Sequence, residues 1–253
     1  MAALQTSASA LSSAVAGLLP ERLVAAAIRG VYGRVEPELG GIAGFVPRGG
    51  TALDVGAWYG PWTRRLTRLA DQVVAIEPTE RLSEHLTRAF PNVRVVRAVA
   101  SDHVGTAILH VPAAGPLVGT SSLEYGEGND VEVPRVTIDS LELTGVRFMK
   151  LDVEGHELPA LRGAEGTIRR DRPRLLIELE ARIQPIAPVV DLLAGWGYEA
   201  SVLPGRVWTP LAGFDLDGHQ RAAIARVHQS FVRRLVWPRP RYVNLVLFRP
   251  VDG

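Results

Sequence analysis

From residue 51 onward, short apolar runs rich in β-branched residues alternate with amphipathic stretches. This alternation is typical of an α/β fold with a largely parallel sheet, because parallel strands need helical crossovers between them. The apolar residues of the amphipathic stretches recur at the three- to four-residue spacing of a helix. The expected strands are 51–55, 72–77, 93–99, 147–152, 174–180, 198–203 and 242–248. The expected helices are 61–70, 79–89, 156–169 and 184–195.

Two segments depart from this alternation. Residues 103–136 contain two extended pieces around a loop rich in Gly and Ser, which predicts a hairpin-like insertion near one edge of the sheet. The loop around Gly119 to Tyr125 is a candidate for acceptor recognition, since loops on a rigid scaffold often carry specificity. Residues 1–50 predict one or two helices that end in a glycine-rich joint.

Composition limits the classes of protein that this chain can represent. With 253 residues, of which 47% are hydrophobic, the chain can bury one sizeable core, and we expect one globular unit. The formal charge of +1 gives no electrostatic reason to expect a nucleic-acid partner. The absence of cysteine excludes disulfides and thiolate metal sites, and it favours a reducing cytoplasm. No apolar stretch reaches the roughly 20 residues of a transmembrane helix, so we expect a soluble cytoplasmic protein.

The first expected strand ends in a carboxylate followed by two glycines, in the stretch "TALDVGAWYG". Ligands of open parallel sheets bind beyond the carboxyl ends of the strands, which makes Asp54 and Gly56 candidate binding residues. Gly56 and Gly60 would let the backbone turn sharply and approach a ligand. Glu77 ends the second strand about twenty residues later, where nucleotide-binding folds place an acidic side chain on a ribose diol. Alternatively, the glycines serve only a tight turn, and Glu77 caps a helix.

The ligand expected at this loop is cationic and contains adenosine. Residues 56–61 read "GAWYGP" and lack the dinucleotide fingerprint G-x-G-x-x-G. A carboxylate at Asp54 would repel a pyrophosphate but attract the sulfonium and ammonium groups of S-adenosylmethionine. After the third strand, Ser101 and Asp102 are candidates to reach the adenine, although an Asp before a glycine loop is also ordinary turn chemistry.

The chain contains, in this order, the segments "LDVGAWYGPWT", "VVAIEP", "VRAVASDHVGTAIL", "VTIDSL", "FMKLDVEGHELPALRGAEGTI" and "RPRLLIELE". In order and spacing, these segments resemble the FkbM-type family of S-adenosylmethionine-dependent methyltransferases. The resemblance covers residues 51–180, and one departure is Trp58, where the family usually has asparagine. It implies a class I methyltransferase (Rossmann-like) fold of seven strands with the last antiparallel, and O-methylation of sugar or polyketide hydroxyls. We expect residues 51–253 to form this domain after a helical extension over residues 1–50.

Methyl transfer to a neutral hydroxyl needs a general base or a metal that lowers the hydroxyl pKa. The stretch "KLDVEGHE", residues 150–157, offers both kinds of group at the end of the fourth strand. His156 is a candidate base because its ordinary pKa suits proton abstraction near neutral pH. Asp152 and Glu154 are further catalytic candidates. The alternative is that His156 is a solvent-facing residue of the first helical turn.

A second carboxylate pair, Glu178 and Glu180, ends the fifth strand. Adjacent parallel strands would bring this pair near Asp152, in the way that catechol O-methyltransferase gathers carboxylates around magnesium. Carboxylate oxygens suit Mg²⁺, so a magnesium site at these residues is expected as an option. Ion pairing with Arg174, Arg182 or Lys150 would neutralise the carboxylates instead.

Three functions remain open from the sequence. The first is an O-methyltransferase acting on a small-molecule or glycan acceptor, and the second is a nicotinamide-dependent reductase. The third is a catalytically silent cofactor-binding protein, because a fold does not guarantee chemistry. The N-terminal helices are also a candidate dimer contact, so a homodimer is one option. The basic segment 217–241 suits either an anionic partner or a solvated helix face.

Overall fold

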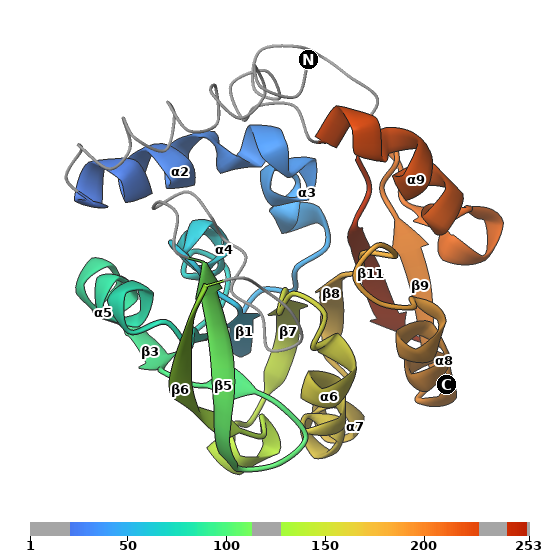
Figure 1. The fold of residues 1–253 in the computed structure, drawn as a ribbon. Coiled ribbons are helices and arrows are strands. Elements are labelled where there is room, and N and C mark those ends of the chain that lie inside the picture. The colour runs from blue at the N-terminus through green and yellow to red at the C-terminus, as the bar shows by residue number, and fades with distance from the viewer. Residues whose placement is uncertain (1–20, 113–127, 228–241, 252–253) are drawn as a thin grey trace.

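A twisted sheet of eight strands forms the centre of the protein (Figure 1). The structure is a computed structural model that describes residues 21–112, 128–227 and 242–251. The strand order is β10-β9-β11-β8-β7-β1-β2-β3. The strands are β1 Thr51–Val55, β2 Gln72–Ile76, β3 Val93–Val96, β7 Val146–Leu151, β8 Arg174–Glu178, β9 Tyr198–Val202, β10 Thr209–Pro210 and β11 Leu245–Pro250.

The pairing of the strands confirms the predicted α/β fold. Strands β3, β2, β1, β7 and β8 are joined by parallel pairs, while β11 lies antiparallel between β8 and β9. The family resemblance predicts seven strands, and the two-residue β10 adds an eighth at the edge of the sheet. All five residues of β1 are buried, as expected for a strand that is covered on both faces.

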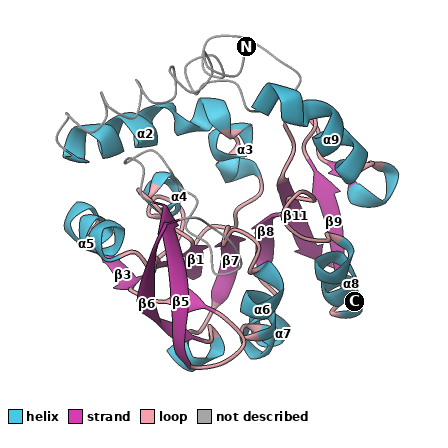
Figure 2. Cartoon of the chain, in the orientation of Figure 1, coloured by secondary structure: helices cyan, strands magenta, loops and turns pink. Residues whose placement is uncertain are grey.

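Helices cover both faces of the sheet, as the cyan ribbons of Figure 2 show. The prediction of a single helix over residues 156–169 is wrong, because this segment forms two helices separated at Gly163 and Ala164. A Cβ atom at Gly163 would lie 1.8 Å from the carbonyl oxygen of Ser101, so the chain makes a close approach at this break. The helices of this part are α4 Pro61–Leu66, α5 Glu80–Ala89, α6 Glu157–Arg162, α7 Glu165–Asp171, α8 Ala187–Gly195 and α9 Leu216–Val227.

The N-terminal helices pack against the sheet domain. They are α2 Glu21–Val35 and α3 Pro37–Gly40, followed by the short 3₁₀ helix η1 Ile42–Gly44. Leu39 and Phe45 belong to the same buried cluster as Phe148 of β7 and Leu176 of β8. The residues after α2 are therefore part of the core, and the boundary at residue 50 remains a prediction. No helix in the described ranges is long and apolar enough to cross a membrane.

The predicted insertion forms a second, small sheet beside the main one. Its strands are β4 Val99–Ala100, β5 Gly105–Pro112 and β6 Gly128–Val136, in the order β4-β6-β5. Strands β5 and β6 pair antiparallel, which confirms the hairpin (Figure 1). The predicted strand 93–99 stops at Val96, because the chain then enters this second sheet. The candidate loop Gly119 to Tyr125 lies outside the described residues, as do residues 1–20 and the part 228–241 of the basic segment.

The close approach at Gly163 gives a test of the packing. We expect Gly163→Ala to lower the free energy of unfolding by about 1 to 3 kcal/mol, because the added methyl group would overlap the Ser101 carbonyl. Urea denaturation monitored by circular dichroism measures this change. Gly195→Ala is the matched control, since a Cβ at the end of α8 meets nothing within 4 Å. A variant Gly163→Ala as stable as Gly195→Ala would contradict the close approach.

Candidate active site

The loop after β1 begins with a buried carboxylate and a position that only glycine can occupy. One carboxylate oxygen of Asp54 accepts a hydrogen bond of 2.5 Å from the Thr63 hydroxyl, and the other is buried without a partner in the described part of the chain. Burial raises the pKa of Asp54, against the opposing effect of the Lys150 ammonium. Gly56 has φ +78°, and a Cβ there would lie 1.8 Å from the carbonyl oxygen of Asp152. The carboxyl ends of β1 and β7 therefore touch through backbone atoms.

The rest of this loop uses the left-handed backbone region twice more. Gly60 has φ +75°, and a Cβ there would lie 2.6 Å from the Phe90 ring. Trp58 has φ +50°, which is uncommon for a bulky residue. Its ring lies 5.7 Å from the ring of Tyr32 in α2 and 5.1 Å from that of Tyr59. Asparagine, which the resembling family has at this position, adopts this backbone region more readily.

Glu77 joins the first loop to the start of α5. Its carboxylate is buried and accepts hydrogen bonds from the backbone N–H groups of Trp58, at 2.9 Å, and Thr79, at 3.0 Å. Thr79 is the N-cap residue of α5 and precedes its first helical residue, so Glu77 links the first loop to the chain that enters α5 and accepts no hydrogen bond from the helix itself in the described part of the chain. Each carboxylate oxygen can accept a further hydrogen bond, so a ribose contact remains a prediction that this geometry allows.

The structure brings Ser101 together with both His156 and Asp102, since the Ser101 hydroxyl also donates a hydrogen bond of 3.2 Å to the Asp102 carboxylate. The Ser101 hydroxyl lies 2.9 Å from Nε2 of His156, and both residues are buried. His156 therefore does not face solvent, and it connects the start of α6 to the end of β4. Asp102 is exposed and lies 2.6 Å from Nδ1 of His103. The adenine contact of Ser101 and Asp102 stays a prediction.

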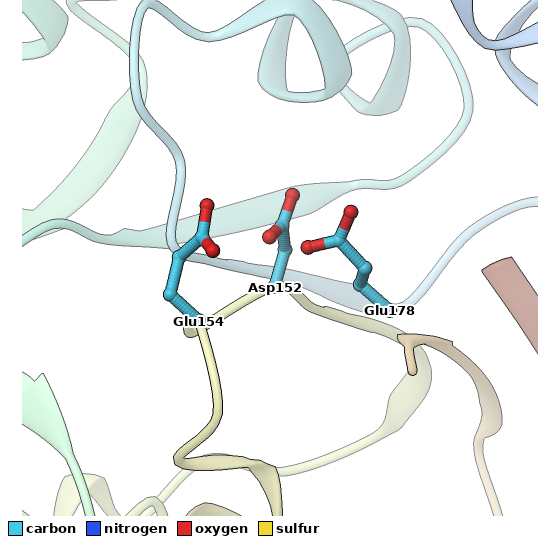
Figure 3. A group of neighbouring side chains, drawn as sticks. All are labelled: Asp152, Glu154 and Glu178. Atoms are coloured by element: carbon cyan, nitrogen blue, oxygen red, sulfur yellow. The ribbon is translucent and has the colours of Figure 1, made fainter. Parts of the chain in front are cut away.

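Three carboxylates gather where β7 and β8 end (Figure 3). Asp152, Glu154 and Glu178 each offer one oxygen, and these oxygens lie within 4.8 Å of one another. Burial and then the neighbouring carboxylates raise the pKa of Glu154 to about 8, and the same causes raise the pKa of Glu178 well above its usual value. Burial also acts to raise the pKa of Asp152, but Lys150, whose Nζ lies 2.7 Å away, and a hydrogen bond with Glu178 together outweigh burial and lower it. We call these three residues the carboxylate cluster.

Glu180 does not join the carboxylate cluster. Strand β8 ends at Glu178, so the alternation of a strand does not carry the two glutamates to the same place. The Glu180 carboxylate instead forms an ion pair with Arg182 and accepts a 3.5 Å hydrogen bond from Asn244. Arg174 lies elsewhere, since its guanidinium donates to the carbonyl oxygen of Phe45. Lys150 and Arg182 thus pair with these carboxylates, as expected if ion pairing neutralises part of their charge.

The N-terminal helices bring groups to this site that the sequence did not indicate. A carboxylate oxygen of Glu36 accepts a 2.6 Å hydrogen bond from Nε1 of Trp62, and Glu36 also hydrogen-bonds Tyr32. Burial raises the pKa of Glu36 to about 7, against the opposing effect of Lys150. Nζ of Lys150 lies 5.8 Å from the centre of the Trp62 ring. Glu36 follows the last residue of α2 and has extended backbone before α3, so helical spacing in the sequence does not place it in this site.

This arrangement suits cationic ligands. The unpartnered oxygen of Asp54 is buried at the turn where a ligand would approach, and it fits an ammonium group such as that of S-adenosylmethionine. The carboxylate cluster presents oxygen ligands of the kind that Mg²⁺ prefers. Because burial and the neighbouring carboxylates raise the pKa values of Glu154 and Glu178, a cation at the cluster would compete with protons.

The chain matches known proteins at three levels. The model of the methyltransferase FkbM domain matches residues 54–200. A Bacteroides fragilis protein named rRNA adenine N-6-methyltransferase is 36% identical over 81 residues, which are 32% of this chain and 29% of that protein. The crystal structure of methyltransferase FkbM from Methylobacillus flagellatus is 17% identical, with a TM-score of 0.51, over 81% of this chain and 45% of that one. The matches thus span less than half of either relative, and the solved structure shows a shared fold.

The raised pKa of Glu154 predicts how stability depends on pH. Its pKa is about 8 in the folded protein, against 4.5 as the ordinary value. Its contribution to stability is therefore fully present below about pH 4.5 and is lost as the pH rises through 8. We expect Glu154→Gln to remove this loss, so that the urea midpoint of the variant, relative to the wild type, increases from pH 5 to pH 8. Glu84→Gln, at an exposed position of α5, is the control. A constant difference across this range would contradict the assignment.

Proposed function

Because the chain belongs to the methyltransferase FkbM domain family, we propose that it transfers the methyl group of S-adenosylmethionine to a hydroxyl group of its acceptor. The acceptor we propose is a sugar, a glycolipid, a polysaccharide or a polyketide-type molecule. The observation that carries this proposal is the carboxylate cluster, which lies beside the loop of Asp54 and Gly56 at the carboxyl edge of the sheet. A cofactor loop and proton-accepting groups thus occur on one edge.

The proposed cofactor site combines three strand ends. Asp54 would accept a hydrogen bond from the ammonium group, and Gly56 and Gly60 supply the positive φ angles that shape the loop around the cofactor. Glu77 would accept hydrogen bonds from the ribose diol. Ser101 and Asp102 follow β4 and would lie on the adenine side of the cofactor. S-adenosylmethionine supplies an electrophilic methyl group on its sulfonium and leaves as S-adenosylhomocysteine.

The acceptor must lose its hydroxyl proton as its oxygen forms the bond to the methyl carbon. We propose Glu154 as the group that takes this proton. Its carboxylate lies in the cluster, and a pKa of about 8 suits a base near neutral pH. His156 is the second candidate, but its Nε2 is occupied by the Ser101 hydroxyl in a buried contact. Proton transfer to Nε2 of His156 would require this contact to open.

A magnesium ion is the alternative means of activation. Asp152, Glu154 and Glu178 would hold the ion, and it would lower the pKa of the acceptor hydroxyl. This set of ligands replaces the one that included Glu180, because Glu180 is engaged by Arg182. Lys150, which binds Asp152, would compete with the ion for that carboxylate.

Methylation of ribosomal RNA is a second candidate, favoured by the name of the Bacteroides fragilis relative. The match to that relative covers only 32% of this chain and 29% of that protein, and the formal charge of +1 gives no surplus of basic residues to attract RNA phosphates. Family membership also disfavours a nicotinamide-dependent reductase. A catalytically silent protein would differ from a methyltransferase in binding S-adenosylmethionine without transferring its methyl group.

We expect Glu77→Ala to weaken binding of S-adenosylmethionine. Loss of a hydrogen bond to a charged group costs on the order of 1.5 to 3 kcal/mol, which corresponds to roughly a tenfold to hundredfold rise in Kd. Isothermal titration calorimetry with S-adenosylmethionine, S-adenosylhomocysteine and NAD measures this change and tests whether the protein is instead a reductase. Glu84→Ala on the exposed face of α5 is the control. An unchanged Kd in a folded Glu77→Ala protein would remove Glu77 from the cofactor site.

Transfer of a tritiated methyl group tests the acceptor class and its activation. With a panel of methyl hexopyranosides and ribosomal RNA as probes, we expect label in the sugars only. Glu154→Gln should lower turnover roughly 10²- to 10⁴-fold and leave cofactor affinity nearly unchanged, since a base acts in the transition state. His156→Ala should lower the melting temperature, because it removes the buried contact with Ser101, and it should lower turnover less than Glu154→Gln does.

The same assay separates the two means of activation. If magnesium activates the hydroxyl, EDTA should abolish transfer and Mg²⁺ should restore it. Transfer that survives EDTA would show that the general base activates the hydroxyl without a metal. A larger loss of turnover in a stable His156→Ala protein would move the base to His156. Label in RNA but not in sugars would overturn the proposed acceptor class.

A further inference from the structure

Glu157 is a buried glutamate that the proposed reaction does not use. It is the first residue of α6, and only 2% of it is exposed. One of its carboxylate oxygens accepts hydrogen bonds from the backbone N–H groups of Val153, at 3.2 Å, and Gly155, at 3.3 Å. The other oxygen accepts a hydrogen bond from the side-chain amide of Gln184. The Glu157 carboxylate and its three donors lie at the same edge of the sheet as the carboxylate cluster.

The turn held by these bonds has an unfavourable backbone conformation. Glu154 has φ +51° and Gly155 has φ +99°, so two successive residues lie at positive φ. Glycine adopts such angles readily, but for a residue with a side chain they are disfavoured by sterics. A strained residue persists only where its surroundings hold it in place. The two hydrogen bonds to Glu157 are made by the residues on either side of Glu154.

Gln184 extends this contact to the neighbouring strand end. Its backbone N–H donates 3.1 Å to the carbonyl oxygen of Glu180, in the turn that follows β8. Glu157 therefore connects the turn after β7, which carries Glu154, to the segment after Glu178. A glutamate that served only the helix dipole could do so from an exposed position, and Glu165, at the start of α7, is an example that pairs with Arg169 at the surface.

We propose that Glu157 is a positioning residue. Oriented by Gln184, its carboxylate holds the turn from Asp152 to Gly155 so that the Glu154 carboxylate faces Asp152 and Glu178. This inference deepens the proposed function, and its consequence for turnover rests on that function. The structural part of the inference, that Glu157 holds the turn through hydrogen bonds from Val153 and Gly155, does not depend on the proposed function.

The test compares substitutions that remove the acceptor oxygens with one that removes only the charge. Glu157→Met fills a similar volume without an acceptor, so the amides of Val153 and Gly155 should exchange their hydrogens about tenfold faster. Glu157→Gln keeps one acceptor oxygen, and Gln184 can rotate its amide to meet the new NH₂ group. We therefore expect exchange in Glu157→Gln to stay close to that of the wild type. Glu165→Met is the matched control for a first-turn glutamate.

Turnover should follow the same order. With the methyl hexopyranoside probes, we expect Glu157→Met to lower kcat about tenfold to a hundredfold, with the Kd of S-adenosylmethionine within about twofold, and Glu157→Gln to retain most activity. If Glu157→Met does not fold, Gln184→Ala replaces it, because loss of the orienting amide should also speed exchange at Val153 and Gly155.

Two results would overturn the inference. One is unchanged amide exchange in a folded Glu157→Met or Gln184→Ala protein. The other is equal damage in Glu157→Gln and Glu157→Met, which would make the charge, and not the hydrogen bonds, the contribution of Glu157. If the wild type methylates no probe, the proposed function fails, but the exchange measurements, made without acceptor or cofactor, still decide whether Glu157 holds the turn.

Discussion

The ion pair between Lys150 and Asp152 lies at the centre of the charged groups at the candidate site. Lys150 is 2% exposed, and a buried ammonium is tolerated only with a close partner of opposite charge. Burial acts to lower the pKa of Lys150, but Asp152, at 2.7 Å, together with Glu36 and Asp54, outweighs burial and raises it. The neighbouring Glu154 and Glu178 keep raised pKa values, because they are buried close to Asp152. A cation bound there would have to displace protons from these two glutamates.

A backbone contact and two buried carboxylates hold the loops at this edge in place. The backbone of Gly56 lies against the Asp152 carbonyl, Glu77 accepts a hydrogen bond from Trp58, and Glu157 holds the turn after β7. These contacts join the ends of β1, β2 and β7 before any ligand binds. Such preorganisation favours catalysis, because the groups need no rearrangement as charge develops in the reaction. These contacts also hold Trp58 and Glu154 at positive φ, which is an unfavourable conformation for residues with a side chain.

Much of the fold could be predicted from the sequence, because the alternation of apolar runs and amphipathic helices follows directly from burial. The positions of Asp54, Glu77 and Asp152 at strand ends followed from the same pattern. The sequence did not predict that Glu154, and not Glu180, would join Asp152 and Glu178. This depends on where β8 stops and on the left-handed turn at Glu154. Glu36 was missed because its place depends on how a distant helix docks, which periodicity does not encode.

The small second sheet has a core of its own. Val99, Ala107, Leu109 and Val133 form a cluster separate from the two that enclose the main sheet. Substitutions in clusters that share no contacts usually have additive effects on stability. The described part of β5 and β6 can therefore diverge in sequence with little effect on the core of the main sheet. For protein engineering, this makes β5 and β6 the strands to vary, with β4 kept, because Ala100 packs in the main core and Ser101 contacts His156.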